Sequence, residues 1–406
     1  MVDRARVIDV PVLEDDPFDP AVLVDPYGFY ERVREAGPVV FLDRYGVWGM
    51  GRHTEVAHVL GDWETFSSAA GVGLADFRKE APWRPTSLLL EADPPAHTGV
   101  RKPMLHLMTP KMAQALRPAF ESAADELVEE LVQQETFDGV TDLAEVYPVH
   151  VFADAVGLPD QGRHHLLPYA AMVFNAFGPR NDLVAAAFAD AAPVIEWITA
   201  SCRREALAPG GLGAEIWAAV DQGDISAEQA PLLVRSLLAA GLDTTIAGLG
   251  NALHCLATNP EQYEMLHADP ALAKAAFEES LRVDPPVQLF FRTTTRPVEV
   301  AGTVIPADAK VLLFFGAANR DPRRWGDDAD RYDIRRRTAG HLAFGAGIHV
   351  CVGQFIARLE GEVVLGALAR KAASLALDGN PVPKANNTLK AYRHLPLRMT
   401  AARPKQ

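Results

Sequence analysis

Cys351 stands in a glycine-rich run of residues whose composition suits a thiolate that binds a metal ion. Residues 344–353 read Phe-Gly-Ala-Gly-Ile-His-Val-Cys-Val-Gly. Glycines permit a tight turn that directs backbone amides at the sulfur, and such amides tune the charge of a metal-bound thiolate. A helix predicted over residues 352–365 follows at once, and the positive end of its dipole favours the ionised sulfur. Taken alone, the run is more simply interpreted as a buried, inert cysteine on a turn.

A second group of reactive side chains lies within the longest nearly apolar stretch, residues 237–254. Residues 240–245 read Ala-Gly-Leu-Asp-Thr-Thr. The hydroxyl of Thr244 can bond back to the preceding turn of a helix and open it locally, which leaves a groove for small molecules. Gly241 has no side chain to block that groove, and Asp243 beside it is a carboxylate suited to proton relay. For an isolated pair of threonines, hydroxyls bonded to their own helix are the default interpretation.

Two charged pairs at helical spacing complete the candidate chemistry. Glu279 and Arg282 lie three residues apart, so they share one face of a helix and can pair. A surface pair of this kind usually contributes under about 1 kcal/mol, so the spacing identifies nothing by itself. His97 and Arg101 lie four apart on a predicted helix, where they form either an anion site or an ordinary solvated face.

The elements that must position these side chains are mostly helices. Hydrophobic periodicity and capping signals predict helices over residues 25–35, 97–107, 110–131, 182–206 and 226–257, and another that Thr54 caps. The longest begins with a capping box between Ser226 and Gln229 and, at roughly 45 Å, crosses the whole molecule. Strands are predicted over residues 298–300, 303–305 and 310–315, with a hairpin over residues 38–50. Residues 67–95 read as a long irregular loop, which inside a compact fold is usually functional.

Composition bounds the class of protein. A chain of 406 residues is long enough for two domains, and 49% hydrophobic with 23% charged residues is ordinary for a soluble globular protein. The net charge of −14 argues against binding to nucleic acid or an anionic membrane through bulk electrostatics. Cys202, Cys255 and Cys351 are too widely spaced for a disulfide framework or a zinc knuckle. The first residues lack the apolar core of a signal peptide, and Asp243 disfavours a membrane helix, so we expect a cytoplasmic protein.

Together, these motifs resemble those of the cytochrome P450 family. The family's cysteine signature, F-x-x-G-x-x-x-C-x-G, is met in full, and the A-G-x-D-T-T and E-x-x-R motifs occur in the family's order and spacing. The resemblance covers about residues 20–400 and replaces the two-domain expectation. It implies a mainly α fold with a minor β portion, formed by one P450 domain over residues 1–406, of which residues 1–20 are an extended segment. Haem then lies between the long oxygen-binding helix and the cysteine loop.

The resemblance implies haem b as the cofactor and Cys351 as the proximal ligand to its iron. The residues expected to contact the haem are His97, Arg101, Arg292, Phe344, Gly345, His349, Cys351 and Gly353. Among them, the arginines and histidines hold the haem propionates.

The same resemblance assigns roles to the remaining motifs. Asp243 and Thr244 become the catalytic pair that delivers protons to dioxygen. A buried network that holds the segment leading to the cysteine is expected from Glu279, Arg282 and Arg336. Ala329 stands where the family often has proline, a departure that the three charged members tolerate.

The loop before His97 and several aromatic residues indicate a substrate. Arg84, followed closely by Thr86 and Ser87, suits a carboxylate, which arginine binds as a two-pronged fork. A surface arginine on a mobile loop is the alternative. Phenylalanines can form flat walls for an aromatic ring.

The chain also looks like one bacterial branch of the family that oxidises para-substituted benzoic acids. This resemblance implies Arg84 and Ser87 at the substrate carboxylate, with Arg235 and Ser236 closing the far side. The full set of expected substrate contacts is Arg84, Ser87, Leu90, Phe174, Phe177, Arg235, Ser236, Ala240, Val287 and Phe290. Ala239 stands where the branch is expected to have serine, so one carboxylate contact is lost.

We therefore expect a haem-thiolate monooxygenase that hydroxylates or O-demethylates a small aromatic carboxylate such as 4-methoxybenzoate. The chain has no flavin or iron–sulfur motif, so its electrons must come from outside. The resemblance implies a [2Fe-2S] ferredoxin served by an NADH-dependent reductase, for which Arg101, Lys102 and Arg358 are a candidate basic patch. A monomer without nucleic-acid or membrane partners is expected.

Two other functions stay open at this point. A peroxide-driven fatty-acid hydroxylase would share the cysteine site, although the intact Asp243–Thr244 pair disfavours it. A non-catalytic haem protein that binds or senses a ligand is disfavoured by the same pair. Serine hydrolases and nucleotide-dependent enzymes are set aside, because G-x-S-x-G, G-x-G-x-x-G and Walker-type motifs are missing from the sequence.

Overall fold

The computed structural model describes residues 10–402, and helices make up most of its regular structure. In chain order the α-helices are α1 (Pro20–Val24), α2 (Tyr27–Ala36), α3 (His53–Gly61), α4 (Ala96–Leu107), α5 (Pro110–Gln134), α6 (Val146–Val156), α7 (Leu166–Asn175), α8 (Asp182–Ala187), α9 (Ala191–Ser201), α10 (Leu212–Asp221), α11 (Gln229–Ala240), α12 (Asp243–Thr258), α13 (Pro260–Ala268), α14 (Ala273–Val283), α15 (Phe315–Ala318), α16 (Pro322–Trp325) and α17 (Gln354–Lys371). The mainly α fold class predicted from the sequence is confirmed.

The β portion is small and divided among several sheets. Its strands are β1 (Val12–Leu13), β2 (Val40–Leu42), β3 (Val47–Met50), β4 (Phe66–Ser67), β5 (Thr136–Asp138), β6 (Leu289–Thr294), β7 (Val298–Val300), β8 (Thr303–Ile305), β9 (Lys310–Phe314), β10 (Ala372–Leu377), β11 (Val382–Lys384), β12 (Ala391–His394) and β13 (Pro396–Ala401). The largest sheet has the order β1-β2-β3-β9-β6-β4, and the others are β10-β13-β5, β11-β12 and β7-β8. In the largest sheet, β9 pairs parallel to β3 and antiparallel to β6.

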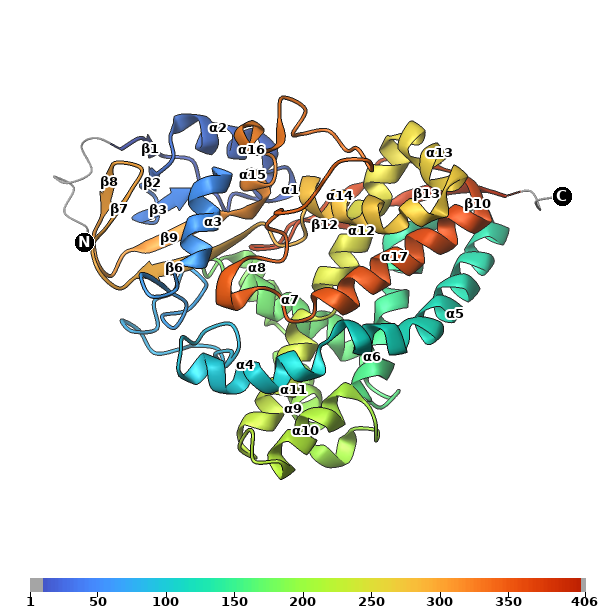
Figure 1. The fold of residues 1–406 in the computed structure, drawn as a ribbon, viewed down its shortest axis with the longest axis horizontal. Coiled ribbons are helices and arrows are strands. Elements are labelled where there is room, and N and C mark those ends of the chain that lie inside the picture. Colours follow the sequence, from blue (N-terminus) through green and yellow to red (C-terminus); the bar gives the residue numbers. More distant parts are fainter. Residues whose placement is uncertain (1–9, 403–406) are drawn as a thin grey trace.

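The sheet and the helices occupy different parts of the molecule. Figure 1 shows β2, β3, β6 and β9 together with α2 and α3 on one side, and α5, α13 and α17 on the other. Helix α17 packs against α5 and α14 and is buried along most of its length. Helix α12 is buried in the same way, as expected for a helix whose residues are apolar or small on every face.

The long helix predicted over residues 226–257 is present with its capping box. The amide of Ser226 donates to Gln229 Oε1 at 2.9 Å, and the amide of Gln229 donates back to Ser226 Oγ at 3.3 Å. The helical path over Gln229–Thr258 is long and apolar enough to cross a membrane, but 61% of its most apolar window is buried inside the protein. That burial is typical of a core helix. The helical path is interrupted between α11 and α12, at Gly241 and Leu242.

Two local predictions are wrong where the structure has a contact distant in sequence, and one strand was missed. Thr54 does not cap α3; the helix begins at His53, whose amide donates to the distant carboxylate of Asp321 at 2.9 Å. The single helix predicted over residues 182–206 is broken after α8, where Phe188 packs on Trp83 with ring centroids 5.8 Å apart. Strand β6 was not predicted, because it is buried on both faces and therefore lacks the alternation of a half-buried strand.

The loop prediction before α4 agrees with the structure. Residues 68–95 contain neither helix nor strand. This segment runs from the edge of the largest sheet to the start of α4, and so brings its side chains against the centre of the molecule.

Candidate active site

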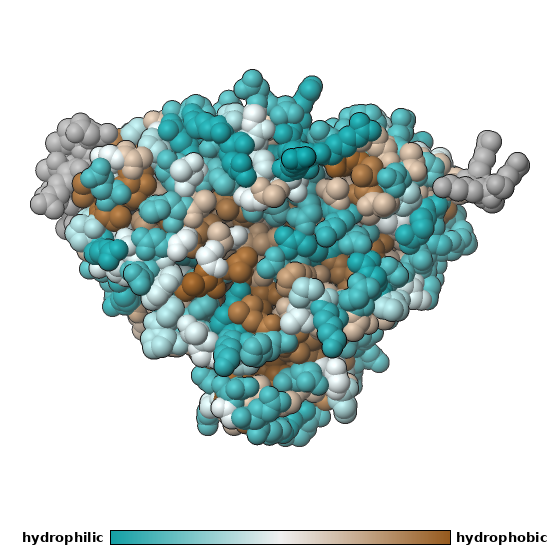
Figure 2. All heavy atoms as spheres, in the orientation of Figure 1, coloured by the Kyte–Doolittle hydropathy of each residue, from teal (hydrophilic) through white to brown (hydrophobic). Residues whose placement is uncertain are grey.

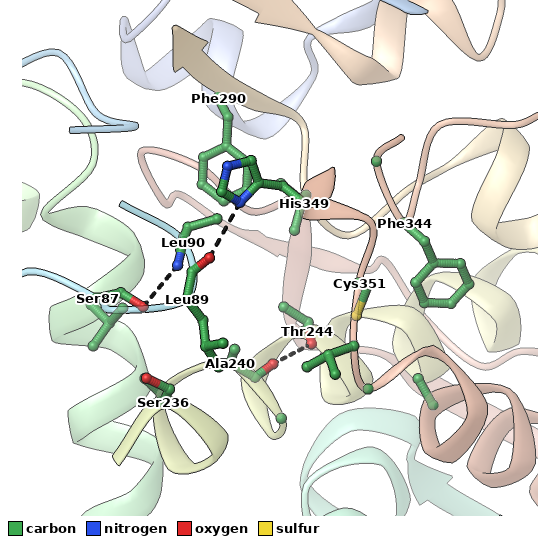
Figure 3. Close-up of a pocket in the computed structure, with 18 of the residues that line it drawn as sticks. Ser87, Leu89, Leu90, Ser236, Ala240, Thr244, Phe290, Phe344, His349 and Cys351 are labelled. Atoms are coloured by element: carbon green, nitrogen blue, oxygen red, sulfur yellow. Dashed lines mark hydrogen bonds between the residues drawn. The ribbon is translucent and has the colours of Figure 1, made fainter. Parts of the chain in front are cut away.

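A cavity of about 280 Å³ lies between the α11–α12 interruption and the cysteine loop. Figure 3 shows Ala240 and Thr244 on one wall, Cys351 and Phe344 at one end, and Ser87 and Ser236 at the other. Most of its lining is apolar. In Figure 2, apolar side chains gather near the centre of the visible face, over the region between α4 and the segment that leads into α17.

The cysteine loop has the geometry of a thiolate ligand site. The amide of Cys351 donates to the carbonyl of Phe344 at 2.8 Å, which closes the turn. Gly347 has a φ of +69°, and a Cβ there would lie 2.2 Å from the carbonyl oxygen of Leu60, so only glycine fits. Burial raises the pKa of the Cys351 thiol, while hydrogen bonds from the amides of Gly353 and Gln354 act in the opposite direction. Such a buried sulfur ionises when a metal cation replaces its proton.

The same part of the molecule also holds a cluster of buried basic side chains. His97, Arg101 and Arg292 are 2%, 7% and 4% exposed, and the rings of His97 and His349 lie 4.4 Å apart. Burial lowers the pKa of Arg292 to about 10 and that of His349 to about 3. Nε2 of both histidines and Nε of Arg101 are buried with no hydrogen-bond partner within residues 10–402. The two arginines are buried cations that need an anion, and the two histidine Nε2 atoms need hydrogen-bond partners, so this cluster is incomplete without an anionic group.

The helix interruption exposes Thr244 to the cavity, while Asp243 beside it is buried and is not among the lining residues. Thr244 Oγ1 donates to the carbonyl of Ala240 at 2.8 Å, which is the back-bond expected to open the helix. Asp243 is 5% exposed, its Oδ2 has no partner within the described chain, and burial raises its pKa. Gly241 serves another purpose than the one expected: a Cβ there would lie 2.3 Å from Phe152 Cζ, so glycine is required by packing behind the helix.

Comparisons with known proteins agree on one family. A family model for cytochrome P450 matches residues 214–391. The chain is 54% identical over 394 residues to cytochrome P450 CYP199A2 of Rhodopseudomonas palustris, an alignment that covers 97% of this chain and 95% of that protein. The chain belongs to the cytochrome P450 family.

Solved structures support the same conclusion. A mutant of P450 EryK in complex with erythromycin B matches with a TM-score of 0.82 and 30% identity, over 95% of this chain and 99% of that one. Cytochrome P450 CREJ in complex with (4-ethylphenyl) dihydrogen phosphate matches with a TM-score of 0.84 and 28% identity, over 95% and 99%. The protein is therefore a cytochrome P450 monooxygenase with haem b as its cofactor.

The residues of this P450 fit haem. The unpaired basic cluster of His97, Arg101, Arg292 and His349 matches the two carboxylates that haem b carries, and the sulfur of Cys351 lines the same cavity. Phe344, Gly345 and Gly353 line it beside the sulfur. When bound, haem supplies the iron that takes up dioxygen and cleaves it with electrons from a donor.

Asp243 and Thr244 have properties that suit proton delivery. Because its pKa is raised, the Asp243 carboxyl can carry a proton at Oδ2 at a higher pH than an exposed aspartate can. The Thr244 hydroxyl is oriented by its bond to Ala240 and lines the cavity. The cavity lining around Thr244 is mostly apolar, which suits controlled proton delivery.

A charged network supports the cysteine segment. The side chains of Glu279 and Arg282 are both 0% exposed. Arg282 Nε and Nη2 each donate a hydrogen bond of 2.7 Å to one carboxylate oxygen of Glu279. Arg336 Nε donates to Glu279 Oε1 at 3.2 Å. Arg282 Nη1 donates to the carbonyl of Ala329 at 2.6 Å, so the residue that replaces the family's proline contributes through its backbone. The structure thus brings the three charged residues together and ties them to the segment that precedes the cysteine loop.

Aromatic side chains form the wall at the substrate end. The ring centroids of Phe174 and Phe177 lie 6.0 Å apart, and those of Phe177 and Phe290 lie 5.3 Å apart at an interplanar angle of 87°. Leu90, Val287 and Ala240 line the same cavity. All six residues predicted to contact the substrate therefore line one cavity.

The polar residues at the substrate end also line the cavity, but they are not equally available. Ser87 Oγ accepts from the amide of Leu90 at 3.2 Å and keeps its own proton free. Arg235 Nη2 donates to the carbonyl of Thr86 at 3.0 Å, and Ser236 Oγ donates to the carbonyl of Leu232 at 2.9 Å.

Arg84 differs from the prediction. It lines the cavity, yet both of its terminal nitrogens are bound by Glu91, at 2.8 and 2.6 Å. Sequence reasoning missed Glu91; its only signal was an acidic residue directly after the apolar run Leu88–Leu90.

The predicted basic patch for a redox partner is wrong in two of its three members. Arg101 is 7% exposed and faces the haem cluster. Arg358 is ion-paired with Glu278 and stacks over the ring of Phe344 at 4.2 Å. The positions of Arg101 and Arg358 along the sequence do not show that both side chains already have partners in the fold. Of the three predicted residues, only Lys102 is exposed.

Proposed function

We propose that this P450 hydroxylates or O-demethylates a small para-substituted aromatic carboxylate, such as 4-methoxybenzoate, with residues 1–406 acting as one domain. The proposal depends on one observation. The cavity has aromatic walls between a reactive end at Thr244 and a polar end at Ser87, Arg235 and Ser236.

This arrangement suits a rigid molecule with an anion at one end and a reactive group at the other. Arg235 and the Ser87 hydroxyl can hold a carboxylate away from Cys351, while Phe177 and Phe290 flank the ring. The para group then points toward Thr244, and the fixed orientation determines which carbon is oxidised. Ala239 lines the polar end without adding a donor.

The comparisons support a molecule of this shape. The CREJ structure holds a para-substituted phenyl phosphate, which is likewise an aryl anion with an alkyl group opposite the charge. The resemblance to the benzoate-oxidising branch points to the same substrate class.

The expected reaction consumes 4-methoxybenzoate, dioxygen, NADH and a proton. Insertion of one oxygen atom into a methyl C–H bond gives an unstable hemiacetal, which breaks into 4-hydroxybenzoate and formaldehyde, and the second oxygen atom leaves as water. We infer that the two electrons come from NADH through a reductase and a [2Fe-2S] ferredoxin, because the sequence has no flavin or iron–sulfur motif of its own. We infer that the protein acts as a monomer in the cytoplasm.

Spectral titration of the haem protein tests the proposal. Addition of 4-methoxybenzoate should displace water from the iron side of the pocket and shift the Soret band, and turnover with NADH and a ferredoxin system should release formaldehyde in a one-to-one ratio to 4-hydroxybenzoate. A shift with long-chain fatty acids but none with 4-methoxybenzoate would contradict it. Product formed with hydrogen peroxide but not with NADH would favour the peroxide-driven alternative.

A further inference from the structure

The substrate end of the cavity carries two arginines, and the structure treats them differently. Outside the haem cluster, the guanidinium groups that line the cavity are those of Arg84 and Arg235. Arg235 has one hydrogen bond, to a backbone carbonyl, and no ion pair within residues 10–402. Arg84 forms a two-pronged ion pair with Glu91, seven residues further along the chain.

The Arg84–Glu91 pair is buried, and of its charged atoms only Arg84 Nε has no partner within residues 10–402. The two side chains are 8% and 1% exposed. Glu91 also accepts from the amide of Val72 at 3.2 Å and from the amide of Ser87 at 3.1 Å, so both of its oxygens are fully used. A substrate carboxylate that captured Arg84 would leave a buried carboxylate without its counter-charge, which is strongly unfavourable.

The pair also has a structural connection to the aromatic wall. The Arg84 guanidinium lies 5.0 Å from the ring centroid of Phe77 and 4.7 Å from that of Phe177. Through the Ser87 amide, Glu91 fixes the residue whose hydroxyl is free to donate to a ligand. Arg84 is thus held as part of the wall.

The charges at this end follow from these contacts. Arg84 and Glu91 cancel, so Arg235 supplies the net positive charge. We propose that Glu91 is a specificity-determining residue. By neutralising Arg84 it leaves Arg235 as the cation that binds the substrate anion, and the net charge of the pocket then matches one carboxylate. This inference rests on the proposed function, because it assigns the contacts of that same substrate.

The test compares an acid with its neutral analogue of the same shape. Dissociation constants of 4-methoxybenzoate and 4-methoxybenzamide are measured by haem spectral titration, and their ratio, amide over acid, reports the charge of the pocket. Partial unfolding removes signal without changing this ratio, so the readout separates charge from stability.

Three variants give distinct expectations. In Arg235→Met the ratio should fall at least about tenfold, because the available cation is gone. In the double variant Arg84→Met with Glu91→Met it should stay within about threefold of the wild type, because a neutral pair is replaced by neutral side chains. In Glu91→Gln it should rise about tenfold, because Arg84 then lacks its carboxylate and attracts the substrate's. The matched control is Glu80→Gln. Glu80 lies on the same loop as Glu91 and forms an exposed ion pair with Arg180, so its replacement should leave the ratio unchanged.

The outcomes separate the two proposals. If the double variant loses the preference for the acid as fully as Arg235→Met does, or if Glu91→Gln leaves the ratio unchanged or lowers it, Glu91 does not have this role. If the wild-type protein itself does not prefer the acid, the aromatic-carboxylate function is wrong, and the assignment of Glu91 fails with it.

Discussion

The haem end and the substrate end of the cavity both gather arginines, yet the two sets are in opposite electrostatic states. At the haem end, Arg101 and Arg292 are buried beside two histidines whose Nε2 atoms have no partner in the described chain. At the substrate end, Arg84 is matched by Glu91 in the fold itself.

The difference shows which site in the protein needs a negative charge from a bound group. Burial without a counter-ion is costly, so a cluster of unpaired cations marks a place where the cofactor brings anions. An arginine that already has its carboxylate is part of the wall. The residue type is the same in both cases, and the neighbours of each arginine differ.

Replacement of Cys351 tests the haem end most severely. Cys351→Ala should abolish the thiolate-type ferrous–carbon monoxide spectrum and lower monooxygenase turnover by roughly a hundredfold or more, because within residues 10–402 no other cysteine lines the cavity. Cys202→Ala is the matched control, since that sulfur is 2% exposed in the core and burial raises its pKa to about 12. A thiolate-type spectrum that survived in Cys351→Ala would overturn the assignment of the ligand.

The charged network that holds the cysteine segment should respond through stability. Glu279→Gln leaves Arg282 buried without its carboxylate, and we expect a loss of about 3–5 kcal/mol in the free energy of unfolding, together with release of haem on mild heating. Denaturant titrations followed at the Soret band measure this. Asp221→Asn, which breaks an exposed pair with Arg204, should leave the stability unchanged. Equal losses in the two variants would show that burial of the network does not matter.

The buried carboxyl of Asp243, next to Thr244 in the chain, should show a pH dependence. Asp243→Asn is expected to lower turnover by about a hundredfold, because its proton is delivered in the rate-determining sequence. The pKa of Asp243 is raised by burial, so the wild-type rate should hold at low pH and fall as pH rises through the folded pKa, above the usual aspartate range. The variant should lack that limb of the profile.

The same raised pKa makes a prediction for stability. A raised folded pKa means that the folded state binds the proton more tightly than the unfolded state, so the stability contributed by Asp243 is present at low pH and lost as pH rises. Asp243→Asn should therefore be more stable than the wild type at neutral pH, and the gain should shrink as the pH is lowered. A gain that is constant with pH would contradict a buried, titrating carboxyl.

The smallest expected effect sharpens the substrate end. Ala239 lines the cavity beside Arg235 and Ser236, and Ala239→Ser adds a hydroxyl donor there. One further hydrogen bond to a carboxylate should tighten 4-methoxybenzoate binding about three- to tenfold, as measured by spectral titration. Toluene derivatives without a carboxylate serve as the control ligands and should bind as they do to the wild type. Equal tightening of both ligand types would mean that the added volume, not the hydrogen bond, is responsible.

Prediction from the sequence succeeded where the decisive contacts are local. The capping box at Ser226 and Gln229 and the back-bond from Thr244 to Ala240 join residues three or four apart, so residue types and spacing suffice. Thr54 and the helix over residues 182–206 were predicted wrongly for the opposite reason, since Asp321 and Trp83 act across the fold.

The sequence by itself determined the family, the cysteine turn and the reactive pair on the long helix, because each is written in residues close together along the chain. Only the tertiary structure decided which cations are free. A buried charge is stabilised or penalised by whatever lies within a few ångströms of it, and for Arg84, Arg101 and Arg358 those neighbours come from other parts of the chain or from the folding back of a loop. Spacing along the chain carries no record of that distance, so the electrostatics of the pocket had to be read from the fold.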